Sequence, residues 1–181
     1  PVSRTNITIA NNTATSTRGG GVSFYRPGAV ILTNNIISNN ISERLDNTIP
    51  VKLYVDGAAD LHTKTAGIGG VFYRNSEELY SFSEFIGSAT NNEAEYRALI
   101  KGLEESVKLN ISNIEIFADS ELVVKQINGD YKVKNERMQK LYKMVYKILN
   151  SINSWSIKHI PREKNSVADK LSKDGMRGKK E

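Results

Sequence analysis

The chain contains no cysteine and only 2 histidines among its 181 residues. Disulfide bonds, thiolate nucleophiles and cysteine-ligated zinc are therefore excluded, and His62 and His159 alone cannot form a histidine-rich metal site. A metal site in this protein must use oxygen ligands. No run of about 18 apolar residues occurs, and the sequence does not open with a basic start followed by an apolar block. We therefore expect neither a membrane span nor a signal peptide, and a cytoplasmic location.

The composition fits a folded domain with a basic surface. Hydrophobic residues make up 39% of the chain, which is enough for a core, and the formal net charge is +5. A positive balance favours a polyanionic partner such as nucleic acid, although many basic proteins bind none. The positive charge is concentrated between Tyr131 and Lys147, a segment with six cationic residues and one acidic residue, Glu136. These cations are Lys132, Lys134, Arg137, Lys140, Lys143 and Lys147.

The composition changes near Pro50. Residues 1–49 are rich in Asn, Thr and Gly, and short β-prone runs are followed by Asn pairs, which resembles one or two rungs of a parallel β-helix. So few rungs cannot bury a stable core, and a flexible polar leader remains an equal alternative. We predict an extension over residues 1–49, one domain over residues 50–175 and a charged tail over residues 176–181.

The domain alternates strands and helices. The first three predicted strands are joined by short connections, which is typical of an antiparallel meander. Helical spacing of apolar residues and capping residues then predict helices separated by two further strands. Strands are expected over residues 51–56, 67–73, 79–86, 114–118 and 155–160, and helices over residues 92–109, 121–128, 136–149 and from 165 onward. The sequence therefore predicts an α/β fold.

Four carboxylates stand at the ends of these elements. Asp56 and Asp119 each follow a strand, and strands joined through helices are normally parallel, so their carboxyl ends should meet at one edge of the sheet. Glu95 lies in the first turn of one helix and Asp169 in the first turns of the last, where both can reach this edge. Four like charges in one place require a cation, and we predict two Mg²⁺ ions held by oxygen ligands.

Each acid also has a structural interpretation. Asp56 could belong to a turn, Asp119 could cap a helix, and Asp169 could be a surface charge. For each acid alone, the structural interpretation is favoured over a role in a metal site. Four such acids at the ends of four elements are not explained by coincidence, and the metal site is then favoured. Glu93 competes with Glu95, and we choose Glu95 because it falls on the side of the helix that faces the sheet.

The acids lie in four blocks whose order along the chain is informative: Tyr54–Ala58 (YVDGA), Thr90–Leu99 (TNNEAEYRAL), Ala118–Ser120 (ADS) with Leu122–Val123, and His159–Asn165 (HIPREKN) leading to Ala168–Asp169. Together these blocks resemble ribonuclease H of type 1, in particular its archaeal and bacterial branch. The resemblance covers about residues 51–173. It implies a ribonuclease H-like mixed five-stranded sheet of order 3-2-1-4-5 flanked by helices.

The resemblance also implies an activity. Members of this family are endonucleases that cut the RNA strand of RNA/DNA hybrids by two-metal-ion catalysis with Mg²⁺, for which Mn²⁺ can substitute. Asp56, Glu95, Asp119 and Asp169 would be the metal ligands. Either Arg162 or His159 would be the auxiliary catalytic residue, and we favour Arg162. The substrate contacts implied by the family pattern are Gly57, Thr90, Asn91, Asn92, Ser120 and Asn165, although residues 90–92 can also be a simple helix cap.

Two departures from the family pattern concern substrate contacts and leave the acids intact. Residues 59–65 replace the usual Asn-Pro-Gly loop after the first aspartate, and Glu121 stands where some relatives have glutamine. Two alternative functions therefore stay open. One is a related nuclease that acts on double-stranded RNA or DNA intermediates, and the other is a nucleic-acid-binding module without catalysis. We expect a monomer that binds an RNA/DNA hybrid and no membrane.

Overall fold

The computed structural model describes residues 49–178. The predicted extension, with its β-helix-like rungs or polar leader, lies outside the described residues apart from Ile49, so its boundary stays a prediction. The same holds for the last three residues of the charged tail. Within the described range no helix is long and apolar enough to cross a membrane.

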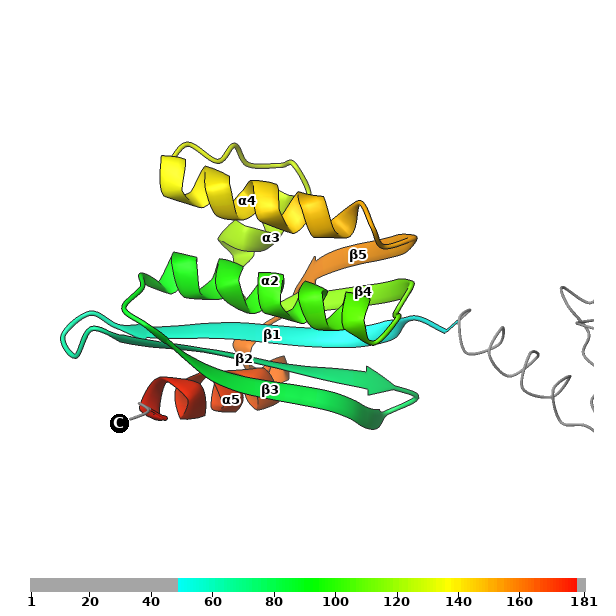
Figure 1. Cartoon of the computed structure of the whole chain (residues 1–181), viewed down its shortest axis with the longest axis horizontal. Coiled ribbons are helices and arrows are strands. Elements are labelled where there is room, and N and C mark those ends of the chain that lie inside the picture. The colour runs from blue at the N-terminus through cyan, green and yellow to red at the C-terminus, as the bar shows by residue number, and fades with distance from the viewer. Residues whose placement is uncertain (1–48, 179–181) are drawn as a thin grey trace, which may run out of the picture. The chain divides into compact units, whose positions relative to one another are not determined.

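Five strands form one mixed sheet (Figure 1). They are β1 (Val51–Asp60), β2 (Thr65–Arg74), β3 (Glu77–Gly87), β4 (Asn113–Ala118) and β5 (Ser154–His159), and their order in the sheet is β3-β2-β1-β4-β5. The pairs β1–β2 and β2–β3 are antiparallel, whereas β4 pairs in parallel with both β1 and β5. The predicted mixed sheet of order 3-2-1-4-5 is confirmed.

Helices lie on both faces of this sheet. In Figure 1, α2 (Asn91–Lys108) and α4 (Glu136–Leu149) lie on one side and α5 (Ser166–Arg177) on the other. The short helix α3 (Glu121–Ile127) follows β4, and the 3₁₀ turn η1 (Arg162–Lys164) precedes α5. The last helix thus extends to Arg177, into the segment that was predicted as a charged tail.

The core lies between the sheet and α2. Alternate residues of β1, namely Val51, Leu53 and Val55, are at most 1% exposed, as the period-two pattern predicts for the inward face of a strand. Leu99 and Leu103 of α2 pack against them. Gly102 permits this close packing, because a Cβ atom there would lie 2.7 Å from Leu53 Cδ2.

The opposite face of β1 and β2 carries α5 at very short range. A Cβ atom on Gly69 would collide with the backbone of Leu171 and Ser172, and one on Gly67 would collide with Met176. These two glycines in β2 therefore allow the helix to lie directly on the strands. The contact matters for the site described below, because it brings the first turns of α5 over the middle of β1.

The strand β1 is longer than predicted. The expected strand covered residues 51–56 and stopped at Gly57, but pairing with β2 continues to Asp60 opposite Thr65. The sequence signal stops early because β1 changes partners along its length. Residues 52–55 pair with both β2 and β4, whereas the later residues pair with β2 alone and form one arm of a hairpin.

Candidate active site

The register between β1 and β4 places two aspartates side by side. Val55 and Ala118 are the last residues paired between these parallel strands, so the next residue of each chain segment, Asp56 and Asp119, emerges at the same edge. This is the meeting of strand ends that the sequence predicted.

Glu95 reaches the same edge from α2. Its Oε2 accepts a hydrogen bond from the backbone N–H of Gly57 at 3.3 Å. A side chain on residue 57 would collide with the backbone of Ala94 and Glu95, so the absence of a Cβ atom allows α2 to approach β1 at this point. Gly57 therefore fixes the distance between the helix that carries Glu95 and the strand that carries Asp56.

The three carboxylates of Asp56, Glu95 and Asp119 form a cluster in which one oxygen atom from each lies within 4.8 Å of the others. Burial, together with the negative charges of Asp119 and Asp169, raises the pKa of Asp56 to about 6. Burial and the charges of Asp56 and Asp119 raise the pKa of Glu95 to about 9. Charging all three groups is therefore costly without a cation, and an all-oxygen donor set of this kind fits Mg²⁺ or Mn²⁺.

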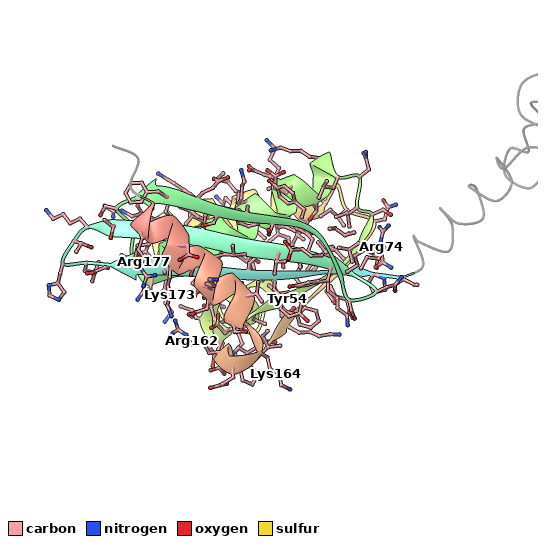
Figure 2. The ribbon with its side chains drawn as sticks, turned by 90° about the horizontal axis from the view of Figure 1, so that it is seen from below. Tyr54, Arg74, Arg162, Lys164, Lys173 and Arg177 are labelled. Carbon is pink, nitrogen blue, oxygen red and sulfur yellow. The ribbon has the colours of Figure 1, made fainter. Side chains whose placement is uncertain are left out.

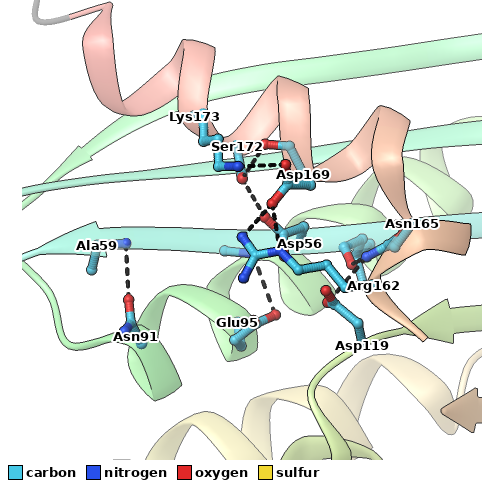
Figure 3. Close-up of polar contacts among 12 residues, drawn as sticks. Asp56, Ala59, Asn91, Glu95, Asp119, Arg162, Asn165, Asp169, Ser172 and Lys173 are labelled. Atoms are coloured by element: carbon cyan, nitrogen blue, oxygen red, sulfur yellow. Dashed lines mark hydrogen bonds and ion pairs between the residues drawn. The ribbon is translucent and has the colours of Figure 1, made fainter. Parts of the chain in front are cut away.

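Asp169 is next to this cluster but has different partners (Figure 3). Its Oδ1 accepts hydrogen bonds from the guanidinium group of Arg162, and its Oδ2 accepts one from Lys173 Nζ at 2.6 Å. Partial burial acts to raise the pKa of Asp169, but the bonds from Lys173 and Arg162 outweigh it and hold this pKa below its usual value. The structure thus gathers three of the four predicted acids, and the fourth is paired with two cations beside them.

Ser172 is a site residue that the sequence reasoning missed. This serine, buried in α5, donates a hydrogen bond to Asp56 Oδ2, and this bond opposes the effect of burial on the pKa of Asp56. Ser172 and Lys173 follow Asp169 by three and four residues, which is the spacing of neighbours on one helix face. That spacing was the available signal.

Asn165 has a structural role in the site, and the substrate contact expected for it stays a prediction. It is 1% exposed, and its Nδ2 donates to Val55 O at 2.9 Å and to Asp119 Oδ1 at 3.2 Å. The side chain therefore connects the start of α5 to β1 and orients the Asp119 carboxylate.

The cluster opens into a hollow of about 450 Å³. Arg162 lines this hollow together with the three acids, whereas His159 ends β5 as an exposed residue and does not line it. Gly57 and Asn91, two of the predicted substrate contacts, also line it. Arg162 thus lies at the hollow and His159 outside it, and the choice of Arg162 as the auxiliary residue stays a prediction.

Two of the remaining predicted contacts, Thr90 and Ser120, are helix caps. Thr90 and Glu93 form a capping box at the start of α2, which explains why Glu93 is not part of the acid cluster. Asn91 Oδ1 accepts from Ala59 N at 3.0 Å and so joins the same helix to β1. Ser120 caps α3 through Val123 N, and Asn92 is exposed in the first turn of α2. The cap interpretation is therefore correct for Thr90, the cap of α3 is Ser120 and not Asp119, and a substrate role of these residues stays a prediction.

Fold and acid cluster together define a ribonuclease H-like domain. A family model described as reverse transcriptase-like matches residues 54–175, and the chain belongs to this family.

Similar proteins agree with this assignment. The bifunctional protein Rv2228c of Mycobacterium tuberculosis is 37% identical over 128 residues, a match that covers 70% of this chain and 35% of that protein. The chain therefore spans about a third of the length of this relative. Among solved structures, ribonuclease H1 of the archaeon Halobacterium salinarum is 32% identical with a TM-score of 0.68, and the match covers 71% of this chain and 98% of that structure. The ribonuclease H domain of Rv2228c has a TM-score of 0.67. The LC11 ribonuclease H1, solved with an RNA/DNA hybrid, is 34% identical with a TM-score of 0.66, and the match covers 70% of this chain and 96% of that structure.

Proposed function

We propose that this protein is a divalent-metal-dependent endonuclease that hydrolyses the RNA strand of RNA/DNA hybrids. The observation that carries the proposal is the cluster of Asp56, Glu95 and Asp119 at the edge of a ribonuclease H-like sheet. The similarity to ribonucleases H1, one of them solved with a hybrid, supports the choice of substrate.

Asp56, Glu95 and Asp119 would hold the metal, and Asp169 is close enough to contribute to the electrostatics of Asp56. Two Mg²⁺ ions bound there would supply an activated water and stabilise the departing 3′ oxygen, giving 5′-phosphate and 3′-hydroxyl ends. The protein holds these carboxylates in place before substrate arrives. Ser172 fixes Asp56, the Gly57 N–H fixes Glu95, and Asn165 fixes Asp119.

Arg162 supplies positive charge at the same hollow. Its guanidinium group is held against Asp169, yet the side chain is 63% exposed, so it can also meet an arriving phosphate. Asn91 lines the hollow from the start of α2, where it can contact the 2′-hydroxyls that distinguish RNA from DNA in the minor groove.

The exposed face of α4 would contribute to affinity without reading sequence. Lys140, Lys143 and Lys147 are exposed along this helix, while Val145 and Leu149 are buried on its other side. Exposed lysines neutralise phosphates and release counterions, so hybrid binding should weaken steeply as salt is raised.

Cleavage of end-labelled duplexes tests the proposal. We expect the full chain to cut the RNA strand of a hybrid with Mg²⁺ or Mn²⁺, to be inactive in EDTA, and to leave RNA duplex and DNA duplex uncut. Asp119→Asn should abolish cleavage by removing a metal ligand, whereas Asp130→Asn, on an exposed residue outside the site, should not. Wild-type-like activity of Asp119→Asn would refute the mechanism. Preferential cleavage of RNA or DNA duplex would refute the substrate and favour a related nuclease.

A further inference from the structure

The helix α5 divides one face of the sheet into two regions, and the second region contains another hollow. Figure 2 shows Arg162, Lys173 and Arg177 on one side of this helix, and Tyr54 and Arg74 on the other. The hollow on the Tyr54 side has a volume of about 410 Å³, which lies in the usual range of ligand sites, about 300–1,000 Å³. It does not share Asp56, Glu95 or Asp119 with the hollow of the acids.

The floor of this second hollow is aromatic and held rigid. Tyr54 and Tyr73, from the neighbouring strands β1 and β2, both line it. The ring of Tyr54 stacks on Phe117 with 4.8 Å between centroids, and Tyr73 meets it edge-on at 5.9 Å. Phe117 does not line the hollow, so it supports Tyr54 from outside. A planar ligand would meet an aromatic surface whose orientation is already set, which lowers the entropic cost of binding.

The charge around the hollow has one sign. Lys52 and Lys164 line it, and no aspartate or glutamate does. Within residues 49–178 neither lysine forms an ion pair. Burial, with Tyr73 and Glu115 nearby, raises the pKa of Tyr54, so its hydroxyl stays uncharged at neutral pH. The hollow therefore favours an anionic ligand.

We propose that this hollow binds a nucleotide of a single-stranded nucleic acid, with the base against Tyr54 and Tyr73 and the adjoining phosphates at Lys52 and Lys164. Aromatic side chains beside a cationic groove are the usual means by which proteins bind single strands without reading sequence. Valine and alanine side chains complete an apolar wall suited to a base, namely Val71, Val167 and Ala168. An uncharged apolar ligand would leave both lysines without a role.

The 3₁₀ turn η1 connects this hollow to the site of the acids. Its first residue, Arg162, lines the hollow of the acids, and its last residue, Lys164, lines the aromatic one. Tyr54 and Asp56 lie two residues apart on the same face of β1, a separation of roughly 7 Å. A single-stranded continuation of a bound duplex can therefore pass over η1 and place a base on Tyr54.

Fluorescence anisotropy of a labelled oligouridylate in EDTA tests this site without cleavage. The double variant Lys52→Gln, Lys164→Gln should bind at least about fivefold more weakly than wild type, and so should Tyr54→Leu, because stacking on one aromatic ring contributes at least this factor. Tyr54→Phe keeps the ring and should keep the affinity. The matched control Lys64→Gln, Lys108→Gln removes the same charge outside both hollows and should change affinity less than twofold.

Thermal unfolding of each variant shows that a loss of binding is not a loss of fold. The proposal is overturned if Tyr54→Leu folds and binds like wild type, or if the control variant loses as much affinity as the Lys52 and Lys164 variant. The test is independent of the proposed function. Tyr54-dependent binding of oligouridylate without cleavage of hybrid would refute the proposed nuclease activity and leave the proposed nucleotide site standing. Cleavage of blunt hybrid without Tyr54-dependent binding would refute the nucleotide site and leave the nuclease activity standing.

Discussion

Asp56 is the residue on which most of the site converges. It is 3% exposed, it belongs to β1, and its neighbours come from α2, β4 and α5. A buried carboxylate needs hydrogen bonds or a cation to stay charged, and the bond given by Ser172 is the one that the protein supplies directly. Removing it should affect the metal more than the fold.

Ser172→Ala should lower metal affinity and activity by about 10-fold to 100-fold, because residues that orient a metal ligand typically have effects of this size. The smaller side chain fits the site, so unfolding should change little. Mn²⁺ titration by calorimetry and the rate of hybrid cleavage measure the two effects. Ser166→Ala, on an exposed residue at the start of the same helix, is the control. Unchanged Mn²⁺ affinity in Ser172→Ala would show that the hydrogen bond to Asp56 has no role in the site.

Gly57→Ala should be destabilised by about 1–3 kcal/mol or more, because the added methyl group meets the backbone of α2 where neither side can yield. Gly129→Ala offers a comparison, since Gly129 has φ +85° but open space where the added Cβ atom would lie, and strain alone should cost about 1 kcal/mol there. Chemical denaturation measures both values. We expect only the first variant to lose cleavage at temperatures where it is still folded, because Gly57 also sets the position of Glu95. If the two variants lost equal stability and kept equal activity, the close approach of α2 would not matter.

At the scale of elements, the sequence predicted best those segments whose pattern is local. The alternation in β1 and the helical spacing in α2 reflect a single buried face each, and both elements were found where expected. The end of β1 was missed because it depends on pairing with β2 and β4. Partners that come from other elements leave no periodic signal in the sequence.

The site shows the same division. Asp56, Asp119 and Glu95 could be placed from strand ends and a helix start, and the structure brings them together. The hydrogen bond from Ser172 to Asp56 could not, because it depends on how α5 lies against the sheet. The glycines of β2 that allow this approach were read only as strand residues, and their role is visible only once the helix is in place.

The whole molecule combines a net charge of +5 with a cluster of negative charge at one edge of its sheet. The basic surface attracts a polyanion, and the acid cluster requires a cation where that polyanion would be cut. Burial makes the charged forms of Asp56 and Glu95 costly, and the acids also repel one another when no cation neutralises them. Stability should therefore depend on pH and on metal together.

In EDTA, stability should fall as pH rises from about 4 to about 9. The folded protein raises the pKa of Asp56 to about 6 and that of Glu95 to about 9, so it keeps protons that the unfolded chain has released. Stability from these two groups is complete below their unfolded pKa values and is lost as pH passes the folded ones. For Asp56 alone, the raised pKa means that the free energy of unfolding falls by on the order of 3 kcal/mol as pH rises through this window.

Thermal unfolding at several pH values, with EDTA and with excess Mg²⁺, measures this dependence. Mg²⁺ should restore stability most at the alkaline end, where the carboxylates are charged and available as ligands. Glu95→Gln should flatten the curve in EDTA, whereas Glu136→Gln, on an exposed residue of α4, should leave its slope unchanged. A melting temperature in EDTA that stays constant across the range would mean that neither burial nor mutual repulsion penalises the charged carboxylates in the folded protein, and the case for a metal at this edge would lose its electrostatic basis.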